Sequence, residues 1–321
     1  MASSKADERD HGNEAASTFT HRKVAGEPCW NRAYAIAEAS MTTDAKATRA
    51  DLAKNAAHAL RASGVAHIPR LFEPALIETL LTRFRRERPE LFGAPTLLMD
   101  KSIVGTQRYL FPLPLEPDEG AFELLFAPLL TEFFSETLGA AWELEAYGLI
   151  IAFPGAKDQH FHRDGGLMYP ETGLDRVMPV TAMTVAIPLV DCNARTGHTR
   201  FAFASHRFPD PEPEESDAVG VDLAVGDCLA WDFRIRHLGA ANLSDAPRPM
   251  IYATVCRSFW TDHKNLVPGH NARLTIRRDV LAELDDALLR RLVRADCGDG
   301  RPALSEADYR RLVGPATQHQ V

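Results

Sequence analysis

The pattern of apolar positions predicts a helix, a strand and a second helix after a polar N-terminal stretch. Residues 47–64 repeat apolar positions with a helical period, and Gly64 suits the C-terminal end of that helix. A short strand is predicted at 65–72. Pro74 then begins another helix. The inward face of this second helix is expected to carry Leu76, Leu80 and Phe84.

From residue 102 the pattern changes to short extended runs. An extended run at 102–113 and a short helix at 121–138 come first. Apolar or alternating runs separated by turn residues follow, at 141–153, 157–164, 177–191, 199–205, 228–237 and 248–260. Several short strands at this spacing are typical of a sandwich or barrel. The fold class is therefore mainly β with flanking helices, because helical periodicity returns from about residue 272.

Three regions follow from this pattern. Residues 1–45 are polar and charged, which predicts a disordered tail. Residues 46–270 form the β domain with its N-terminal helices, and 271–321 form a C-terminal helical extension. An insertion at 167–179 directly follows a histidine-rich stretch, and we interpret it as a candidate lid.

Composition narrows the classes of partner. The net charge is -8 and the pI is about 5.8, so no basic footprint for nucleic acid or an anionic membrane is present. No run approaches the roughly 18 apolar residues of a membrane span, and the N-terminus lacks the apolar core of a secretory signal. Five scattered cysteines indicate reduced thiols. We therefore expect a cytoplasmic protein, for which a homo-oligomer is compatible with the sequence.

The stretch QHFHRDGG at 159–166 carries three metal-ligand side chains: His160, His162 and Asp164. In a strand these would share one face, with neighbours about 6.6 Å apart and the outer pair about 13 Å apart. Two of them can therefore meet on one ion, but all three cannot without a bend. The candidates are an HxH pair, as in cupins, or an HxD pair, as in the two-histidine, one-carboxylate sites of non-haem iron enzymes.

A second histidine and an arginine add to this stretch. In the run 228–237, His237 ends a face that is otherwise apolar and includes Trp231. Arg248 opens the next strand, eleven residues later. An arginine beside a metal histidine is suited to bind a carboxylate through two charge-assisted hydrogen bonds. The alternatives are a satisfied core histidine and an ordinary surface arginine.

With these spacings the sequence resembles the phytanoyl-CoA dioxygenase-like family of Fe(II)/2-oxoglutarate-dependent oxygenases. The resemblance covers roughly 52–260. The matching residues are Gln159-x-x-His162-x-Asp164, Gly197-x-Thr199-Arg200-Phe201 leading to Ser205-His206-Arg207, Gly226-Asp227, and His237-x-Gly239-x-x-Asn242-x-Ser244 with Arg248. Two departures, His198 for a common proline and Ala204 for a glycine, do not touch the metal set.

The resemblance implies a double-stranded β-helix, or jelly roll, of the cupin-like kind. It implies that Fe(II) is held by His162, Asp164 and His237, and that Arg248 pairs with the distal carboxylate of 2-oxoglutarate. Gln159 would lie beside the metal or cosubstrate. Thr184 matches a position where the family often places a polar cosubstrate contact.

The activity implied is that of a dioxygenase that uses O2 and 2-oxoglutarate to hydroxylate a small molecule, such as a specialised metabolite, with release of succinate and CO2. Related halogenases lose the carboxylate ligand, whereas Asp164 is present here. Desaturation, epoxidation and ring formation remain alternatives. Candidate substrate contacts are Arg108 and Tyr109 on an early strand and Met168 and Tyr169 on the lid.

Two other classes of function are compatible with parts of the pattern. A hydrolytic zinc enzyme could use the same two histidines and aspartate, but it would have no use for Arg248 at that spacing. A non-catalytic metal- and 2-oxoglutarate-binding module on the same fold would be expected to have a degraded ligand set, whereas this set is intact. The oxygenase is therefore the leading interpretation.

Overall fold

The computed structural model of the chain describes residues 47–93, 103–115, 121–207, 212–262, 274–298 and 303–313. The tail predicted at 1–45 lies outside these residues. The helices are α2 (Arg49–Ser63), α3 (Pro74–Glu87), α4 (Ala121–Leu125), α5 (Pro128–Leu138), α6 (Arg278–Glu283), α7 (Asp286–Leu289) and α8 (Glu306–Leu312). The strands are β1 (Val65–Ile68), β2 (Ile103–Gly105), β3 (Arg108–Pro112), β4 (Pro114–Leu115), β5 (Trp142–Ala152), β6 (Ala182–Pro188), β7 (Thr199–Ala202), β8 (Val219–Val221), β9 (Cys228–Asp232), β10 (Arg236–Gly239), β11 (Arg248–Arg257) and β12 (Thr275–Ile276).

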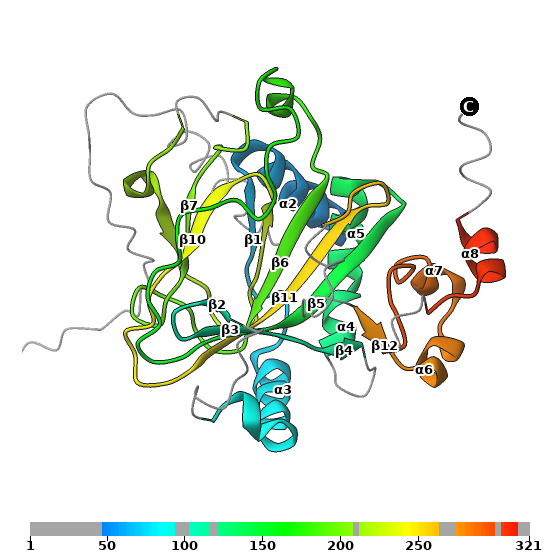
Figure 1. The fold of residues 1–321 in the computed structure, drawn as a ribbon, viewed down its shortest axis with the longest axis horizontal. Coiled ribbons are helices and arrows are strands. Elements are labelled where there is room, and N and C mark those ends of the chain that lie inside the picture. The colour runs from blue at the N-terminus through cyan, green and yellow to red at the C-terminus, as the bar shows by residue number, and fades with distance from the viewer. Residues whose placement is uncertain are drawn as a thin grey trace, which may run out of the picture.

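Two antiparallel sheets form the centre of the molecule. The larger has seven strands in the order β1-β9-β6-β11-β5-β3-β2, and the smaller has the order β10-β7-β8. In Figure 1 the smaller sheet lies to one side of β6 and β11, and helices α2 and α5 lie behind the larger sheet. Phe201 of the small sheet packs with Trp231 of the large one, at 5.5 Å between ring centroids. This is the predicted mainly β, jelly-roll class of fold.

Side-chain alternation along β6 shows why both faces of the large sheet are covered. Met183, Val185 and Ile187 join the main core with the helices, whereas Ala186 belongs to the cluster between the two sheets. All seven residues of β6 are buried. A strand with one face against helices and the other against a second sheet must be apolar almost throughout. The polar exception on the inner face is Thr184, which therefore marks that face as a place for polar chemistry.

The predicted first helix is confirmed, and the inward face of the second is corrected in one position. Helix α2 begins with a capping box between Thr48 and Asp51 and ends at Gly64, whose φ of 85° is left-handed. In α3 the buried residues are Ile77, Leu80, Leu81 and Phe84. Leu76 was expected inward but is 46% exposed, because the buried spacing of three and four residues starts from Ile77.

The stretch 157–164 was expected to be a strand, and this prediction is wrong. It has irregular backbone with a single bridge, between His162 and His237. Backbone hydrogen bonds from Gln159 to Gly239 and from Gly165 to Phe233 hold it along β10 at intervals. The residues that suggested a strand therefore belong to an irregular segment that lies beside a strand. Such a segment can bend where a strand cannot.

The C-terminal extension is helical, but its first predicted helix at 279–295 is broken. Helix α6 ends at Glu283, and Asp285 caps α7 by accepting a hydrogen bond from Leu288 N at 2.9 Å. An Asp in this role favours a new helix start over continuation of the old one. Within the described parts of the chain, no helix is both long and apolar enough to cross a membrane.

Two glycines with a left-handed backbone differ in their surroundings, because Gly197 packs against the loop after β10 and Gly155 faces open space. Gly197 has φ 95°, and a Cβ there would lie 2.6 Å from the carbonyl oxygen of Ala240. Gly155 has φ 81°, but a Cβ there would meet no atom within 4 Å. We expect Gly155→Ala to cost about 1–2 kcal/mol of unfolding free energy from backbone strain alone. Gly197→Ala should cost about 1–3 kcal/mol more, because overpacking adds to the strain.

Thermal unfolding of the two variants measures this difference. The melting temperature of Gly197→Ala should lie below that of Gly155→Ala, and both should lie below that of the wild type. Equal melting temperatures for the two variants would show that the loop yields to the added methyl group.

Candidate metal centre

His162, Asp164 and His237 come together where the irregular segment 157–165 lies along β10. His162 N donates to His237 O at 2.9 Å, and His237 N donates to His162 O at 2.8 Å. Residues that exchange both backbone hydrogen bonds lie directly opposite each other, with side chains on the same side of the pair. The two imidazoles are accordingly close, with ring centroids 4.4 Å apart.

The three side chains present one ligand atom each to a common point. The Nε2 atoms of His162 and His237 lie 3.7 and 3.6 Å from Oδ1 of Asp164. All three ligand atoms are within 4.8 Å of one another. Bonds of about 2.1 Å keep two ligands of one ion within about 4 Å of each other. The cluster is therefore close to the size that one metal ion requires.

Backbone carbonyls fix the orientation of both histidine rings. Nδ1 of His162 lies 2.7 Å from the carbonyl oxygen of His160, and Nδ1 of His237 lies 3.1 Å from that of Ile235. A carbonyl only accepts hydrogen bonds, so each Nδ1 donates a proton to it, and Nε2 is the nitrogen left to bind a metal when the ring is neutral. Rings held in this way have the ligating nitrogen directed at the centre.

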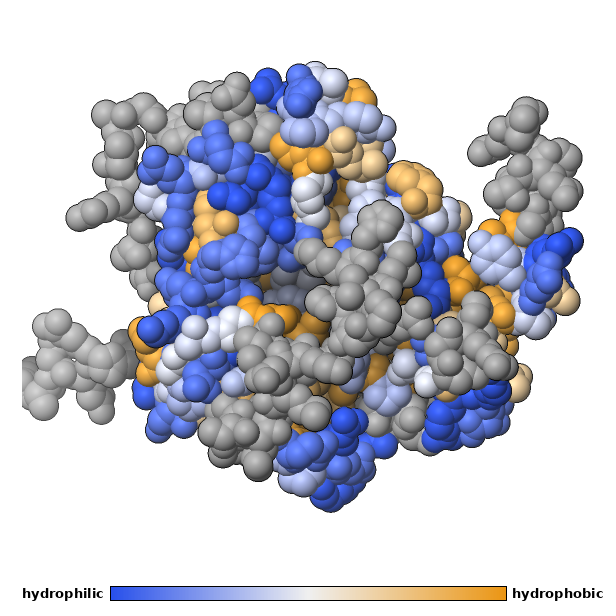
Figure 2. Space-filling view, viewed as in Figure 1, coloured by the Kyte–Doolittle hydropathy of each residue, from blue (hydrophilic) through white to orange (hydrophobic). Residues whose placement is uncertain are grey.

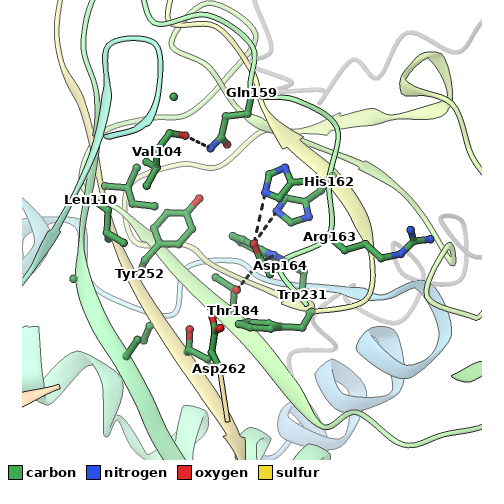
Figure 3. Close-up of a pocket in the computed structure, with 18 of the residues that line it drawn as sticks. Val104, Leu110, Gln159, His162, Arg163, Asp164, Thr184, Trp231, Tyr252 and Asp262 are labelled. Atoms are coloured by element: carbon green, nitrogen blue, oxygen red, sulfur yellow. Dashed lines mark hydrogen bonds and ion pairs between the residues drawn. The ribbon is translucent and has the colours of Figure 1, made fainter. Parts of the chain in front are cut away.

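Two side chains fix the carboxylate of Asp164. Thr184 Oγ1 donates to its Oδ2 at 2.7 Å, and Trp231 Nε1 donates to the same atom at 2.8 Å. Figure 3 shows Thr184 and Trp231 on one side of Asp164 and His162 on the other. Burial opposes ionisation of Asp164, but His237, His162 and the Thr184 hydroxyl together lower its pKa well below the usual value. The carboxylate is therefore ionised and ready to bind a cation.

A cavity of about 580 Å³ opens from this cluster into the space between the sheets. Its polar lining includes the three clustered residues with Gln159 and Arg108, and its apolar lining includes Leu110, Ile150, Trp231 and Phe233. Figure 2 shows the face in view hollowed near its centre, with hydrophilic residues gathered on one side. The volume is within the range of small-molecule sites, roughly 300–1,000 Å³.

Two buried arginines lie close together near this space; Arg108 lines the cavity, whereas Arg248 is not among its lining residues. Arg108 of β3 and Arg248 of β11 both pair with Ala152, from opposite sides of β5. Arg248 is 1% exposed, and no group among the described residues accepts a hydrogen bond from its Nε. Burial, together with the charge of Arg248, lowers the pKa of Arg108 to about 10. A buried guanidinium with an unmatched donor suits an anionic ligand.

The structure brings most of the predicted site residues into this cavity. Gln159 lines it, donating to Val104 O at 2.9 Å and accepting from Gly239 N at 3.0 Å. Thr184 also lines it, although the partner of its hydroxyl is Asp164 and not an open position. Arg108 lines the arginine end. His160 lines the wall beside His162 and orients that ring.

Three predicted substrate residues lie elsewhere. Tyr109 is 8% exposed and packs in the main core, because alternation along β3 turns Arg108 and Leu110 to the cavity and Tyr109 away from it. Met168 and Tyr169 are 40% and 44% exposed and do not line the cavity. Their backbone N–H groups donate to the buried carboxylate of Asp175, so these hydrogen bonds are internal to the insertion.

The cavity residues that sequence reasoning did not assign to the site include Trp231, Phe233, Tyr252 and Asp262. A signal for three of them existed. Trp231 and Phe233 alternate onto the same face as His237, and Tyr252 onto the same face as Arg248. Asp262 follows β11 in irregular backbone, where no periodicity could have assigned a direction to its side chain.

The donor set fits a metal ion. Two imidazoles and one carboxylate, with the remaining directions facing a cavity, form the ligand set of non-haem Fe(II) oxygenases. The unmatched Nε atoms of Arg108, which lines the cavity, and of the buried Arg248 fit a carboxylate-bearing cosubstrate. The residues present therefore match both groups that the sequence implied.

Comparison with known proteins places the chain in a family. The family model described as phytanoyl-CoA dioxygenase (PhyH) matches residues 60–250, which is more than half of the chain. The iron/alpha-ketoglutarate-dependent dioxygenase ausU of Aspergillus calidoustus is 31% identical over 96 residues. That match covers 29% of this chain and 32% of the relative, so the chain aligns with about a third of that protein.

Two solved structures are similar to this chain, and the first of them supports the fold. HygX from Streptomyces hygroscopicus, solved with nickel and 2-oxoglutarate bound, has a TM-score of 0.50 at 13% identity, covering 64% of this chain and 87% of its own. The non-heme alpha ketoglutarate dependent epimerase SnoN from nogalamycin biosynthesis has a TM-score of 0.49 at 20% identity, covering 64% and 83%. With the family match over its β core, the chain belongs to the phytanoyl-CoA dioxygenase family of Fe(II)/2-oxoglutarate-dependent oxygenases.

Proposed function

We propose that this protein is an Fe(II)/2-oxoglutarate-dependent dioxygenase that hydroxylates a small-molecule substrate and releases succinate and CO2. The observation that carries the proposal is the cluster of His162, Asp164 and His237 at the wall of a cavity that Arg108 also lines. The buried Arg248 flanks the same residue of β5 as Arg108 does. A hydrolytic zinc site would explain the cluster but would leave this arginine without a role.

Each residue of the centre has a distinct task. His162, Asp164 and His237 would hold the iron, and their other polar atoms are already used by His160 O, Ile235 O, Thr184 and Trp231. When bound, iron and 2-oxoglutarate together supply the oxidation of the substrate by O2, with decarboxylation of 2-oxoglutarate to succinate. The protein contributes ligand geometry and a cavity lined by Phe233 and Leu110, which limits access of water.

The arginine end is the proposed place for 2-oxoglutarate. Arg248 would pair with the distal carboxylate through its unmatched guanidinium. Arg108, which the sequence suggested as a substrate contact, lies on the other side of β5 from Arg248 and adds positive charge at the same end. We therefore assign Arg108 to the cosubstrate end, where its Nη2 also donates to Ala240 O at 2.8 Å.

A small molecule is the proposed partner. The cavity of about 580 Å³ has room for a compact organic substrate besides the cosubstrate. The net charge of -8 offers no general attraction for nucleic acid. Hydroxylation is the proposed outcome because Asp164 is present as a third ligand. Desaturation and oxidative ring formation remove two hydrogen atoms, so the mass of the product distinguishes them from hydroxylation. Epoxidation also adds one oxygen atom and is distinguished by NMR of the product.

Removal of a metal ligand tests the centre. We expect His162→Ala and Asp164→Ala to abolish measurable 2-oxoglutarate-dependent succinate release, because two side chains hold the ion poorly. His58→Ala, an exposed histidine on α2, is the matched control and should keep wild-type activity. Mass spectrometry of the product should show the gain of one oxygen atom. Unimpaired turnover in either ligand variant would refute the assignment.

Arg248→Lys tests the cosubstrate site. A lysine keeps the charge but loses the two-pronged geometry, so the KM for 2-oxoglutarate should rise about 10- to 100-fold. Arg195→Lys, at a highly exposed arginine in a surface loop, is the control. A KM that stays within twofold of the wild type (roughly a few tenths of a kcal/mol) would remove Arg248 from the cosubstrate site.

Trp231→Phe tests the support of Asp164. The substitution deletes the indole donor to Oδ2 and keeps most of the ring, and loss of such an outer contact typically weakens metal binding about 10- to 100-fold. Trp142→Phe deletes a comparable indole hydrogen bond, to Ser135, far from the centre. Metal titration of the purified proteins should show weaker binding in the first variant alone. Equal affinities would indicate that Thr184 suffices.

A further inference from the structure

Tyr252 lines the cavity but has no task in the metal centre described above. It lies on β11, four residues after Arg248, so both side chains point to the same face of the large sheet. Its partners on the neighbouring strands are Gly148 of β5 and Ala186 of β6. Because these partners are the two smallest residue types, no large side chain stands directly beside the phenol on either strand. The residue is therefore placed to contact whatever fills the cavity.

The ring of Tyr252 supports the metal side of the cavity. It meets the indole of Trp231 edge to face, with ring centroids 5.6 Å apart and an interplanar angle of 77°. Aromatic pairs prefer this arrangement to a face-to-face one. The same indole donates its Nε1–H to Oδ2 of Asp164 at 2.8 Å. A side chain that fixes the indole therefore also helps to fix the carboxylate that would hold the metal.

The hydroxyl of Tyr252 is a donor that the described residues do not use up. The Thr199 hydroxyl of β7 interacts with it. Two hydroxyls carry two protons, and a hydrogen bond between them uses one, so one O–H remains. Within the described part of the chain, no other side chain or carbonyl accepts this proton. Burial raises the pKa of the phenol, although the charges of Arg248 and Arg108 oppose this, so the phenol stays protonated at neutral pH.

The hydroxyl points to the arginine end of the cavity. Figure 3 shows it directed to the side where Gln159 lies. Gln159 and Arg108 meet at Gly239, since a Cβ on that glycine would contact both side chains. This end therefore presents donors: the unmatched Nε atoms of Arg108 and Arg248, and the hydroxyl of Tyr252. A carboxylate accepts about four hydrogen bonds, so a two-pronged guanidinium leaves room for a hydroxyl.

We propose that Tyr252 joins the two ends of the site. Its hydroxyl donates to the distal carboxylate of 2-oxoglutarate beside Arg248. Its ring positions Trp231 and thereby the metal ligand Asp164. This inference rests on the proposed function, because it adds a residue to that same site. The two tasks are separable, because the first needs the phenol oxygen and the second needs only the ring.

Tyr252→Phe tests the hydroxyl, because it removes the oxygen and keeps the ring. Binding to the Fe(II)-loaded protein is measured by calorimetry without O2. The Kd for 2-oxoglutarate should rise about 10-fold, the usual scale for a lost hydrogen bond to a charged group. 2-Oxopentanoate, which has a methyl group in place of the distal carboxylate, should bind both proteins equally. An unchanged Kd for 2-oxoglutarate, or an equal loss for both ligands, overturns the role of the hydroxyl.

Tyr252→Leu and Tyr252→Met test the ring. Fe(II) titration of the full-length proteins should show an affinity about 10-fold lower in both variants and a wild-type affinity in Tyr252→Phe. Tyr309→Leu, at an exposed tyrosine of α8, is the matched control and should keep the wild-type affinity. Wild-type metal affinity in both the leucine and the methionine variant overturns the role of the ring.

The Trp231→Phe background tests whether the ring acts through the indole. That substitution already removes the donor to Asp164, so adding Tyr252→Leu should lower the metal affinity by at most about twofold more. A further loss of about 10-fold would show that the ring acts by another route, and it would overturn the positioning role. A general loss of stability lowers the melting temperature in both backgrounds but does not depend on Trp231 in this way.

Binding by the wild type separates this role from the proposed function itself. Wild-type protein that binds neither Fe(II) nor 2-oxoglutarate contradicts the proposed function, and this inference with it. Wild-type protein that binds both, while Tyr252→Phe and Tyr252→Leu bind them equally tightly, contradicts this inference alone.

Discussion

The reciprocal backbone hydrogen bonds between His162 and His237 are the constraint on which the site depends. They join a segment with irregular backbone to a strand of the small sheet, and they do so at the two residues whose side chains must meet. Since the pair is directly opposed, the imidazoles need no further device to approach each other. Asp164, two residues on, then completes the cluster from the same segment. The large sheet supplies the donors that hold Asp164 in place.

Much of the fold could be predicted because the spacing of apolar residues along the sequence indicates which side chains are buried. The alternating runs identified the main strands, and Gly64 correctly ended the first helix. The same reasoning failed at 157–164, where the backbone makes one bridge instead of a ladder, and neighbouring residues such as His162 and Arg163 both line the cavity. A period of two records which side chains face inward. It does not record whether the segment is paired along its whole length, because pairing depends on a partner elsewhere in the chain.

The candidate site was predictable for a different reason, since ligand types at fixed spacings are rare in combination. His162, Asp164, His237 and Arg248 are local features of short motifs. Tyr109 could not be placed in this way, because neighbouring side chains on β3 point to opposite faces. Arg108 faces the cavity, and Tyr109, the next residue, faces the core. Asp262 was beyond reach altogether. It follows β11 in irregular backbone, and the neighbouring Thr261 accepts a hydrogen bond from Arg294, a residue more than thirty positions later that only the folded chain brings close.

The paired donors on Asp164 also decide how that carboxylate can serve a metal. Thr184 and Trp231 both engage Oδ2, which leaves Oδ1 directed at the two histidine nitrogens. A carboxylate restrained on one oxygen is disposed to ligate in a monodentate way. Chelation through both oxygens would consume a coordination position and break two hydrogen bonds inside the protein. By favouring ligation through one oxygen, Thr184 and Trp231 would leave one more coordination position of a bound metal open for the reactants.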